Sequence, residues 1–229
     1  MYYEMAEKSS IFDMIGPVMI GPSSSHTAGV VKIGLVARRI LGEEPTNAAI
    51  TFYNSFARTY EGHGSDRAIL AGLMGFETDD MRIRDSFAMA KDAKLEYSMK
   101  SVGNASTLHP NSVKIELKGA TRSTEVIGES LGGGVINIVK VNGFTANVTG
   151  NLHTIMITAE DRQGAIAFIA DVLAHDDCNI ATMTVSRKGK NDQACHFIEM
   201  DTPMRPITRE YIQSISWIKD VVYLEPQVK

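Results

Sequence analysis

Helical and alternating patterns of apolar residues follow one another along residues 1–148. Between Val30 and Leu41 apolar residues occupy both sides of a helix, so we expect this helix to be largely buried. Other helices are expected to end at Ile15 and to cover 65–73 and 86–93. Strands are expected at 48–53, 95–100, 112–118, 123–127 and 135–141. This mixture of elements predicts an α+β fold.

Residues 151–229 give a simpler order of strand, helix, strand, strand, helix and strand. The strands are expected at 152–158, 179–187, 194–201 and 221–224, and the second helix at 208–216. The first helix is expected to bury a stripe formed by Ile166, Ile169, Ala170 and Leu173. This order predicts a ferredoxin-like βαββαβ unit, in which two helices cover one face of a four-stranded antiparallel sheet. Small polar residues at 147–151 mark the boundary between the two parts.

Composition narrows the class of protein. A chain of 229 residues with 44% hydrophobic and 22% charged residues is long and apolar enough for one large domain or two small ones, which excludes disorder as its main state. The net charge of −4 gives no reason to expect nucleic acid or an anionic membrane as a partner. No apolar stretch approaches the ~18 residues of a membrane span. The first residues do not resemble a secretory signal, so we expect a cytoplasmic protein that acts on small molecules.

The two cysteines, Cys178 and Cys195, are too few for a metal cluster or a disulfide framework. Their separation matches no zinc-binding spacing. We therefore expect them to be ordinary buried or half-buried residues, and we expect no metal bound by this chain.

The most unusual segment is G-P-S-S-S-H-T-A-G at 21–29, which leads into the long helix. Free backbone N–H groups at a helix start favour an anion such as a carboxylate, and hydroxyl groups add further donors. Simple helix capping is the alternative, although it needs one serine rather than three. The candidate ligand-binding residues here are Ser23, Ser24, Ser25, His26 and Thr27.

A second cluster, G-H-G-S-D at 62–66, places a histidine between two glycines. Histidine is the side chain whose ordinary pKa, about 6.5, suits proton transfer near neutral pH. His63 is therefore a candidate base, and Ser65 is expected to cap the helix that follows. The alternative is an exposed histidine in a capping loop.

Two further clusters lie beside predicted strands. In His109-Pro110-Asn111 the proline fixes its neighbours, although Pro-Asn is also a common turn. In Ser130-Leu131-Gly132-Gly133-Gly134 the glycines permit close approach of a ligand, or they form a flexible loop between strands. The glycine-rich segment at 130–134 does not have the G-x-G-x-x-G pattern, so a dinucleotide site is excluded.

G-P-S-S-S-H-T-A-G, followed by G-H-G-S-D, H-P-N and S-L-G-G-G, resembles the beta subunit of the bacterial iron–sulfur-dependent L-serine dehydratases, over essentially the whole chain. Residues 1–148 look like the family's beta domain, which is similar to the allosteric substrate-binding domain of some phosphoglycerate dehydrogenases. Residues 151–229 resemble an ACT domain, a small regulatory module. ACT domains commonly carry D-x-P-G before their first helix. Here Gln163 replaces the proline between Asp161 and Gly164.

The resemblance implies that L-serine is converted to pyruvate and ammonia, a reaction of amino-acid catabolism and gluconeogenesis. It implies that the partner of this chain is an alpha subunit and that this alpha subunit carries a [4Fe–4S] cluster. By the same resemblance His63 takes the Cα proton, and Ser65 lies close to the substrate. Substrate contacts fall to the turn at 23–27 and to His109, Asn111 and Ser130.

Regulation is implied for residues 151–229. An amino acid or a monovalent cation is expected to bind at Asp161 and Gly164, and the ACT domain is expected to pair two copies of the chain into a homodimer. The competing interpretation is a stand-alone regulatory module that binds an amino acid without catalysis. His63 distinguishes the two, since a sensor has no use for an open histidine. A pyridoxal-phosphate dehydratase is disfavoured because no lysine is paired with a phosphate-binding loop.

Overall fold

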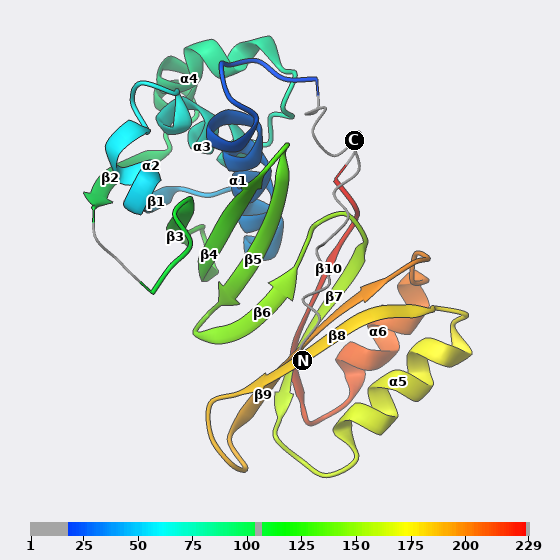
Figure 1. The fold of residues 1–229 in the computed structure, drawn as a ribbon. Helices are drawn as coiled ribbons and strands as arrows, with labels where there is room; N and C mark the ends of the chain where they lie inside the picture. The colour runs from blue at the N-terminus through cyan, green and yellow to red at the C-terminus, as the bar shows by residue number, and fades with distance from the viewer. Residues whose placement is uncertain (1–17, 104–106, 228–229) are drawn as a thin grey trace, which may run out of the picture.

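The computed structural model describes residues 18–103 and 107–227. These residues form a six-stranded sheet and then a four-stranded sheet along the chain (Figure 1). In the first sheet the strand order is β2-β1-β3-β4-β5-β6, with β1 and β2 parallel and every other pair antiparallel. The strands are β1 (Asn47–Tyr53), β2 (Glu96–Val102), β3 (Ser112–Lys118), β4 (Ser123–Gly132), β5 (Val135–Val141) and β6 (Phe144–Val148).

The helices of this first part lie before β1 and between β1 and β2 in the chain. They are a π-helical turn η2 (Ser24–Ala28), α1 (Gly29–Leu41), α2 (Asn54–Thr59), α3 (Ser65–Leu73), a 3₁₀ turn η3 (Met81–Asp85) and α4 (Ser86–Asp92). As expected, α1 is almost entirely buried. It packs closely on α3, because a Cβ on Gly34 would lie 2.9 Å from the carbonyl oxygen of Ile69 and one on Gly72 would collide with that of Val31. Two facing glycines thus set the spacing of the helices that position the site.

Three elements of the first part differ from expectation. The strand β4 runs beyond Ile127 to Gly132, because its polar end pairs with β3, opposite Ser112. The strand β6 was not predicted, although Phe144, Ala146 and Val148 alternate inward and Asn142-Gly143, both at positive φ, make the hairpin turn before it. The helix α2 was not predicted either, since it buries Phe56 alone. The short helix expected to end at Ile15 lies outside the described residues.

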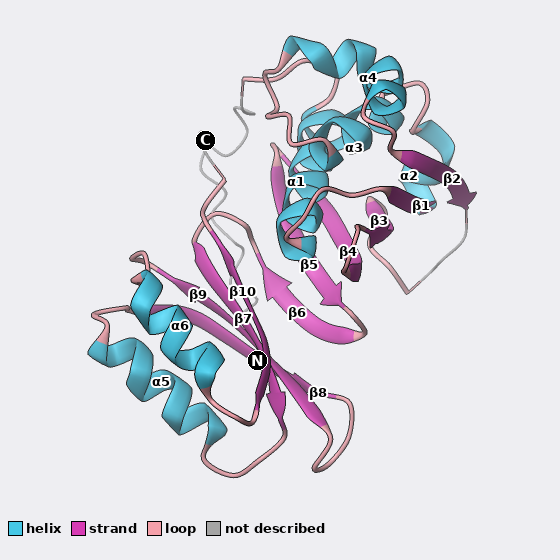
Figure 2. Cartoon of the chain, turned by 180° about the vertical axis from the view of Figure 1, so that it is seen from behind, coloured by secondary structure: helices cyan, strands magenta, loops and turns pink. Residues whose placement is uncertain are grey.

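The second sheet confirms the βαββαβ order. Its strand order is β10-β7-β9-β8, every pair is antiparallel, and the two helices lie on the same face (Figure 2). The elements are β7 (His153–Glu160), α5 (Ala165–His175), β8 (Ile180–Arg187), β9 (Gln193–Met200), α6 (Pro206–Ser214) and β10 (Ile218–Leu224). One expectation about α5 is wrong. Ile166 is 50% exposed, and the buried stripe is Ala165, Ile169 and Leu173 at spacings of four.

The face of the second sheet that the helices leave open packs against the first part. Met156, Cys195, Phe197 and Leu224 belong to the same buried cluster as α1 and the six-stranded sheet. Glu199, only 1% exposed, accepts hydrogen bonds from the backbone N–H and the hydroxyl of Thr149, at 2.8 and 2.7 Å. The segment between β6 and β7 is therefore fixed by a buried carboxylate.

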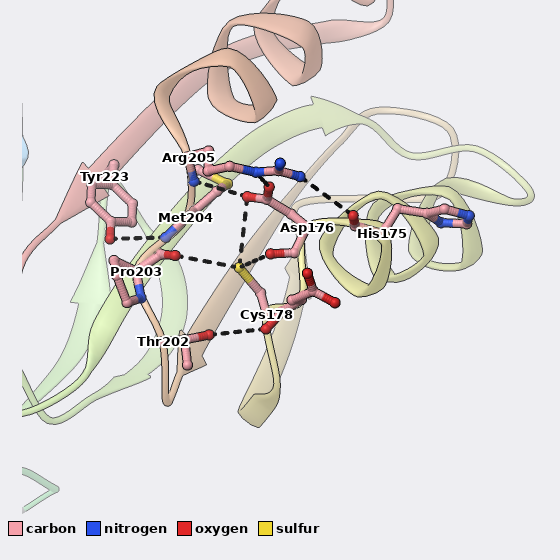
Figure 3. A network of polar contacts seen from close by, with 9 residues as sticks. His175, Asp176, Cys178, Thr202, Pro203, Met204, Arg205 and Tyr223 are labelled. Carbon is pink, nitrogen blue, oxygen red and sulfur yellow. Dashed lines mark hydrogen bonds and ion pairs between the residues drawn. The ribbon is translucent and has the colours of Figure 1, made fainter.

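A polar network joins the end of α5 to the start of α6 (Figure 3). Arg205 forms an ion pair with Asp176, whose carboxylate also accepts from the Arg205 backbone N–H at 2.9 Å. Burial alone raises the pKa of Asp176, but these hydrogen bonds outweigh it and hold the pKa below its usual value. Cys178 lies in the same network and contacts the carbonyl oxygens of Asp176 and Pro203. The network links the two helices of the second part, and in sequence it lies far from the candidate site clusters at 21–134. Within the described residues, no helix is long and apolar enough to cross a membrane.

Candidate functional site

The serine-rich segment forms a turn organised around one imidazole. Ser23 caps η2, and its Oγ accepts from the backbone N–H of His26 at 3.1 Å. The hydroxyl of Ser25 lies 3.0 Å from Nδ1 of His26. Capping therefore occupies one serine, as the alternative interpretation expected, and a second serine serves the histidine ring.

Two reciprocal hydrogen bonds lock this turn to the loop that carries His63. The hydroxyl of Thr27 donates to the carbonyl oxygen of His63 at 3.1 Å, and the hydroxyl of Ser65 donates to that of His26 at 2.6 Å. The predicted capping role of Ser65 is wrong, because Gly64 at φ 70° is the N-cap and Ser65 is the first helical residue. Since both hydroxyls are buried and engaged with backbone, Thr27 and Ser65 fix the two histidines relative to each other.

The rings of His26 and His63 lie side by side. Their centroids are 4.8 Å apart, and the edge of His26 meets Phe56 at 5.0 Å. Nε2 of His26 and Nδ1 of His63 are both buried, and neither has a hydrogen-bond partner among the described residues. Burial lowers the pKa of His26, and the neighbouring charge of a protonated His63 lowers it further. Both effects favour the neutral form of the His26 ring.

The other two sequence clusters meet at the adjoining ends of β3 and β4. Ser130 donates its backbone N–H to the carbonyl oxygen of Asn111 at 3.0 Å, and Nδ1 of His109 accepts from the backbone N–H of Asn111 at 3.1 Å. Ser130 is fully buried, and its hydroxyl has no partner within the part of the chain that the structure describes. This hydroxyl lies against Gly29, since a Cβ there would collide with it.

All four clusters therefore form one continuous group. Ser130 touches the start of α1 directly below the serine-rich turn. The carbonyl oxygen of Pro110 accepts from the backbone N–H groups of Ser55 and Phe56, at 2.8 and 3.4 Å, and Phe56 contacts His26. The hairpin glycines Gly132, Gly133 and Gly134 have positive φ values of 101°, 59° and 79°, so they form the β4–β5 turn.

Sequence reasoning missed the part that α2 plays in this group. Asn54, at φ 51°, turns the chain sharply after β1, and its amide donates to the carbonyl oxygens of Leu108 and His109 at 3.1 and 3.3 Å. A non-glycine residue at positive φ is not visible in a single sequence. An open groove of about 730 Å³ borders the group and is lined by Asn54, Ser55, Arg58, Thr59, Gly103, Leu108 and Pro110. One of its lining residues, Thr59, accepts through its carbonyl oxygen a hydrogen bond from the backbone N–H of His63 at 3.0 Å.

The two residues expected to bind an effector lie in the turn between β7 and α5. The carboxylate of Asp161 accepts from the backbone N–H of Asn191 at 3.0 Å and pairs with Arg187 at 3.3 Å, so it is tied to the β8–β9 hairpin. Gly164 is the N-cap of α5 at φ 84°, and a Cβ there would meet nothing within 4 Å. Its backbone conformation, rather than close approach within the chain, calls for glycine.

The cysteines do not fit an iron–sulfur cluster. Cys178, in the loop between α5 and β8, and Cys195, on β9, are both buried. Burial raises the pKa of Cys195 to about 12, whereas a cluster needs thiolates. Among the described residues no three histidine, cysteine or acidic side chains lie close enough together to hold a metal ion.

Comparison with known proteins identifies the family to which this chain belongs. The family model for the serine dehydratase beta chain matches residues 10–121. The chain is 44% identical over 192 residues to the probable L-serine dehydratase beta chain of Bacillus subtilis (strain 168), covering 84% of this chain and 87% of that one. It is 36% identical over 217 residues to the L-serine dehydratase beta chain of Peptoniphilus asaccharolyticus, covering 94% and 98%.

A solved structure, the ACT domain from GTP pyrophosphokinase of Chlorobium tepidum, aligns with 32% of this chain and 96% of its own length, at 21% identity and a TM-score of 0.27. The two beta chains are matched over most of their length and well above 30% identity. The chain belongs to the serine dehydratase beta-chain family.

Proposed function

We propose that this chain supplies the general base and the substrate-positioning groups of an L-serine dehydratase, which converts L-serine to pyruvate and ammonia together with an alpha chain. The observation that carries the proposal is the pair of locked imidazoles. Four segments far apart in sequence converge on them, and three buried polar atoms in this group, on His26, His63 and Ser130, have no partner within the described residues. Buried polar groups are almost always paired, so these atoms point to a ligand.

In the proposed reaction His63 removes the proton from Cα of serine. The electron pair of the broken C–H bond forms the Cα=Cβ double bond while the Cβ–O bond breaks, and the leaving hydroxide together with the proton taken from Cα gives water. The resulting enamine tautomerises to an imine, which water hydrolyses to pyruvate and ammonia. Expulsion of the hydroxyl calls for a Lewis acid. We assign that role to a [4Fe–4S] cluster on the alpha chain, since the two buried cysteines of this chain do not fit one.

The remaining groups bind and orient. We assign the serine carboxylate to the start of η2, a turn that contains Ser24 and Ser25, since backbone N–H groups and hydroxyls at a helix start suit an anion. Ser130, with Asn111 and His109 beside it, would contact the substrate from the opposite side. Thr27 and Ser65 act through the backbone carbonyls of the two histidines.

The test is His63→Ala in the complex reconstituted with the alpha chain. Loss of a general base costs about 10²- to 10⁴-fold in turnover, and serine binding should change far less. The matched control is His175→Ala, because His175 is exposed on α5, away from the site. Turnover near that of the unmodified complex would instead favour a regulatory module that binds an amino acid without chemistry.

For residues 151–229 we propose the regulatory role of an ACT domain, with pairing of two copies into a homodimer. The βαββαβ order and the Asp161 carboxylate at the turn before α5 support it. Asp161→Ala in the complex should alter substrate cooperativity, the response to monovalent cations or the oligomer size, while turnover at saturating serine is retained. A variant unchanged in all three properties would argue against regulation at this turn.

A further inference from the structure

We propose that His26 is the positioning residue of His63: its neutral ring accepts a hydrogen bond from the Nδ1–H of His63, so that Nε2 of His63 is the atom that faces the substrate. This inference rests on the proposed function, in which His63 is the base, and it names the atom that performs the step.

The first support is the geometry of the two rings. Their centroids are 4.8 Å apart, and each ring has one buried nitrogen without a partner among the described residues, Nε2 on His26 and Nδ1 on His63. A polar atom left unpaired in the interior is costly, and here two such atoms belong to adjoining rings. Hydrogen bonds of catalytic groups are often long in structures without substrate and tighten when the complex forms.

The second support is the tautomer that the surroundings favour. On His26, Nδ1 lies 3.0 Å from the Ser25 hydroxyl and 3.4 Å from that of Ser23. When Nδ1 carries the proton and donates it to Ser25, Nε2 has a free lone pair. A neutral imidazole carries a proton on one nitrogen only, so a proton on Nδ1 of His63 leaves its Nε2 as the base.

The third support is the burial that keeps His26 neutral. The pKa of His26 is lowered first by burial and then by the charge of His63, so the second ring does not compete for the proton that His63 takes. No other charged group acts on His26 enough to reverse this shift. Titratable groups on the surrounding elements include Lys32, Arg38 and Arg39 on α1, Arg58 on α2, Tyr60 and Glu61 in the loop, Asp66 and Arg67 on α3, His109 before β3, and Glu125 and Glu129 on β4.

The backbone makes the arrangement rigid. The Thr27 and Ser65 hydroxyls tie the carbonyl group of each histidine to the segment that carries the other, at 3.1 and 2.6 Å. The rings of His26 and Phe56 also form an edge-to-face contact, with their centroids 5.0 Å apart. These contacts hold the backbone segments of the two histidines together.

The experiment compares His26→Gln with His26→Phe in the full chain. Glutamine keeps an acceptor near the position of Nε2, whereas phenylalanine keeps the ring contact with Phe56 and has no acceptor. Side-chain ¹⁵N NMR of the histidine-labelled chain reports which nitrogen of His63 carries the proton. Turnover and its pH dependence are then measured after reconstitution with the alpha chain.

We expect the proton of neutral His63 on Nδ1 in the unmodified chain and in His26→Gln, and a shift toward Nε2 in His26→Phe. Because a hydrogen bond to the charged form of the base stabilises that form, losing the acceptor should move the acidic limb of kcat/KM to lower pH. We expect kcat to fall at least about 10-fold in His26→Phe, and by no more than the ~10²- to 10⁴-fold that loss of the general base itself would cost. The loss should be smaller in His26→Gln, and KM should change little in both variants.

A proton on Nε2 of His63 in the unmodified chain would overturn this inference. So would equal effects of the two variants on kcat and on the pH profile, since a packing role does not distinguish them in that way. Neither result depends on His63→Ala, so the pairing and the proposed function fail separately. If His26→Phe does not fold, the tautomer in the unmodified chain and in His26→Gln still decides the question.

Discussion

Replacing Gly29 by alanine tests whether the serine-rich turn is packed against β4 as closely as the structure shows. A Cβ at Gly29 would collide with the hydroxyl of Ser130 and lie 2.9 Å from its Cβ. Ser130 has no exposed surface, so it cannot turn out into solvent. The backbone at Gly29 is helical, with φ −60° and ψ −38°, so alanine introduces no backbone strain of its own.

Two opposing contributions set the size of the effect. Overpacking a buried position costs about 1–3 kcal/mol. Alanine in a helical conformation gains about 1 kcal/mol over glycine. The net change in unfolding free energy for Gly29→Ala is therefore a loss of up to about 2 kcal/mol. In a Ser130→Gly background both colliding atoms are gone, so the same substitution should stabilise the chain, and the coupling between the two sites should be about 1–3 kcal/mol.

Urea unfolding of the unmodified chain, the two single variants and the double variant measures this coupling. Gly189→Ala is the matched control, because the nearest atom to a Cβ there is 3.9 Å away. In the reconstituted complex, Gly29→Ala should also reduce turnover by up to about 10²-fold, as expected for a displacement of about 1 Å in the site. Additive effects of the two substitutions, within about 0.5 kcal/mol, would refute the close packing of Gly29 on Ser130.

Three further outcomes follow from the same contacts. Glu199→Leu leaves two donors of Thr149 without an acceptor, so the unfolding free energy should fall by about 2–5 kcal/mol and Tm by roughly 4–20 °C. Glu199→Gln should lose much less stability, and equal losses of the two variants in calorimetry would contradict this. Burial lowers the pKa of His196, so the unfolded chain takes up its proton first as pH falls below about 6.5 and stability drops there. His196→Asn should show a smaller drop in urea midpoint between pH 7.5 and 5.5 than the unmodified chain, and an unchanged drop would count against this assignment. A chain that ends at Asn151 loses the residues that cover the first core, and it should bind a hydrophobic dye and unfold less cooperatively; a sharp, unchanged transition would contradict the shared core.

The sequence predicts regular elements well where one residue pattern determines them. The strands at 112–118 and 135–141 were predicted at their observed limits, and the βαββαβ order of residues 151–229 was predicted in full. Prediction failed where tertiary contacts override the pattern. The helix α2 begins at Asn54, a residue at positive φ that is held by carbonyl groups more than fifty positions later, and nothing in its own sequence announces this.

The same limit applies to the candidate site. Each cluster could be recognised from residue types that suit anions or proton transfer, but their convergence depends on the register of β3 with β4 and on the packing of α1 against α3. The role of Ser65 shows the difference. A serine before a helix predicts a cap, whereas the actual acceptor, the carbonyl oxygen of His26, is 39 residues earlier in the chain. Only the folded structure makes that hydroxyl part of the site.

The central claim, that His63 is the base of the dehydratase, is tested most directly by chemical rescue. His63→Gly in the reconstituted complex should lose turnover by about 10²- to 10⁴-fold and leave a space that a small imidazole can enter. Added imidazoles should restore pyruvate formation in a saturable way, and the rate should rise with the pKa of the imidazole, as expected for proton removal by a general base. Turnover that needs no imidazole, or a rescued rate that does not depend on imidazole pKa, would contradict the claim.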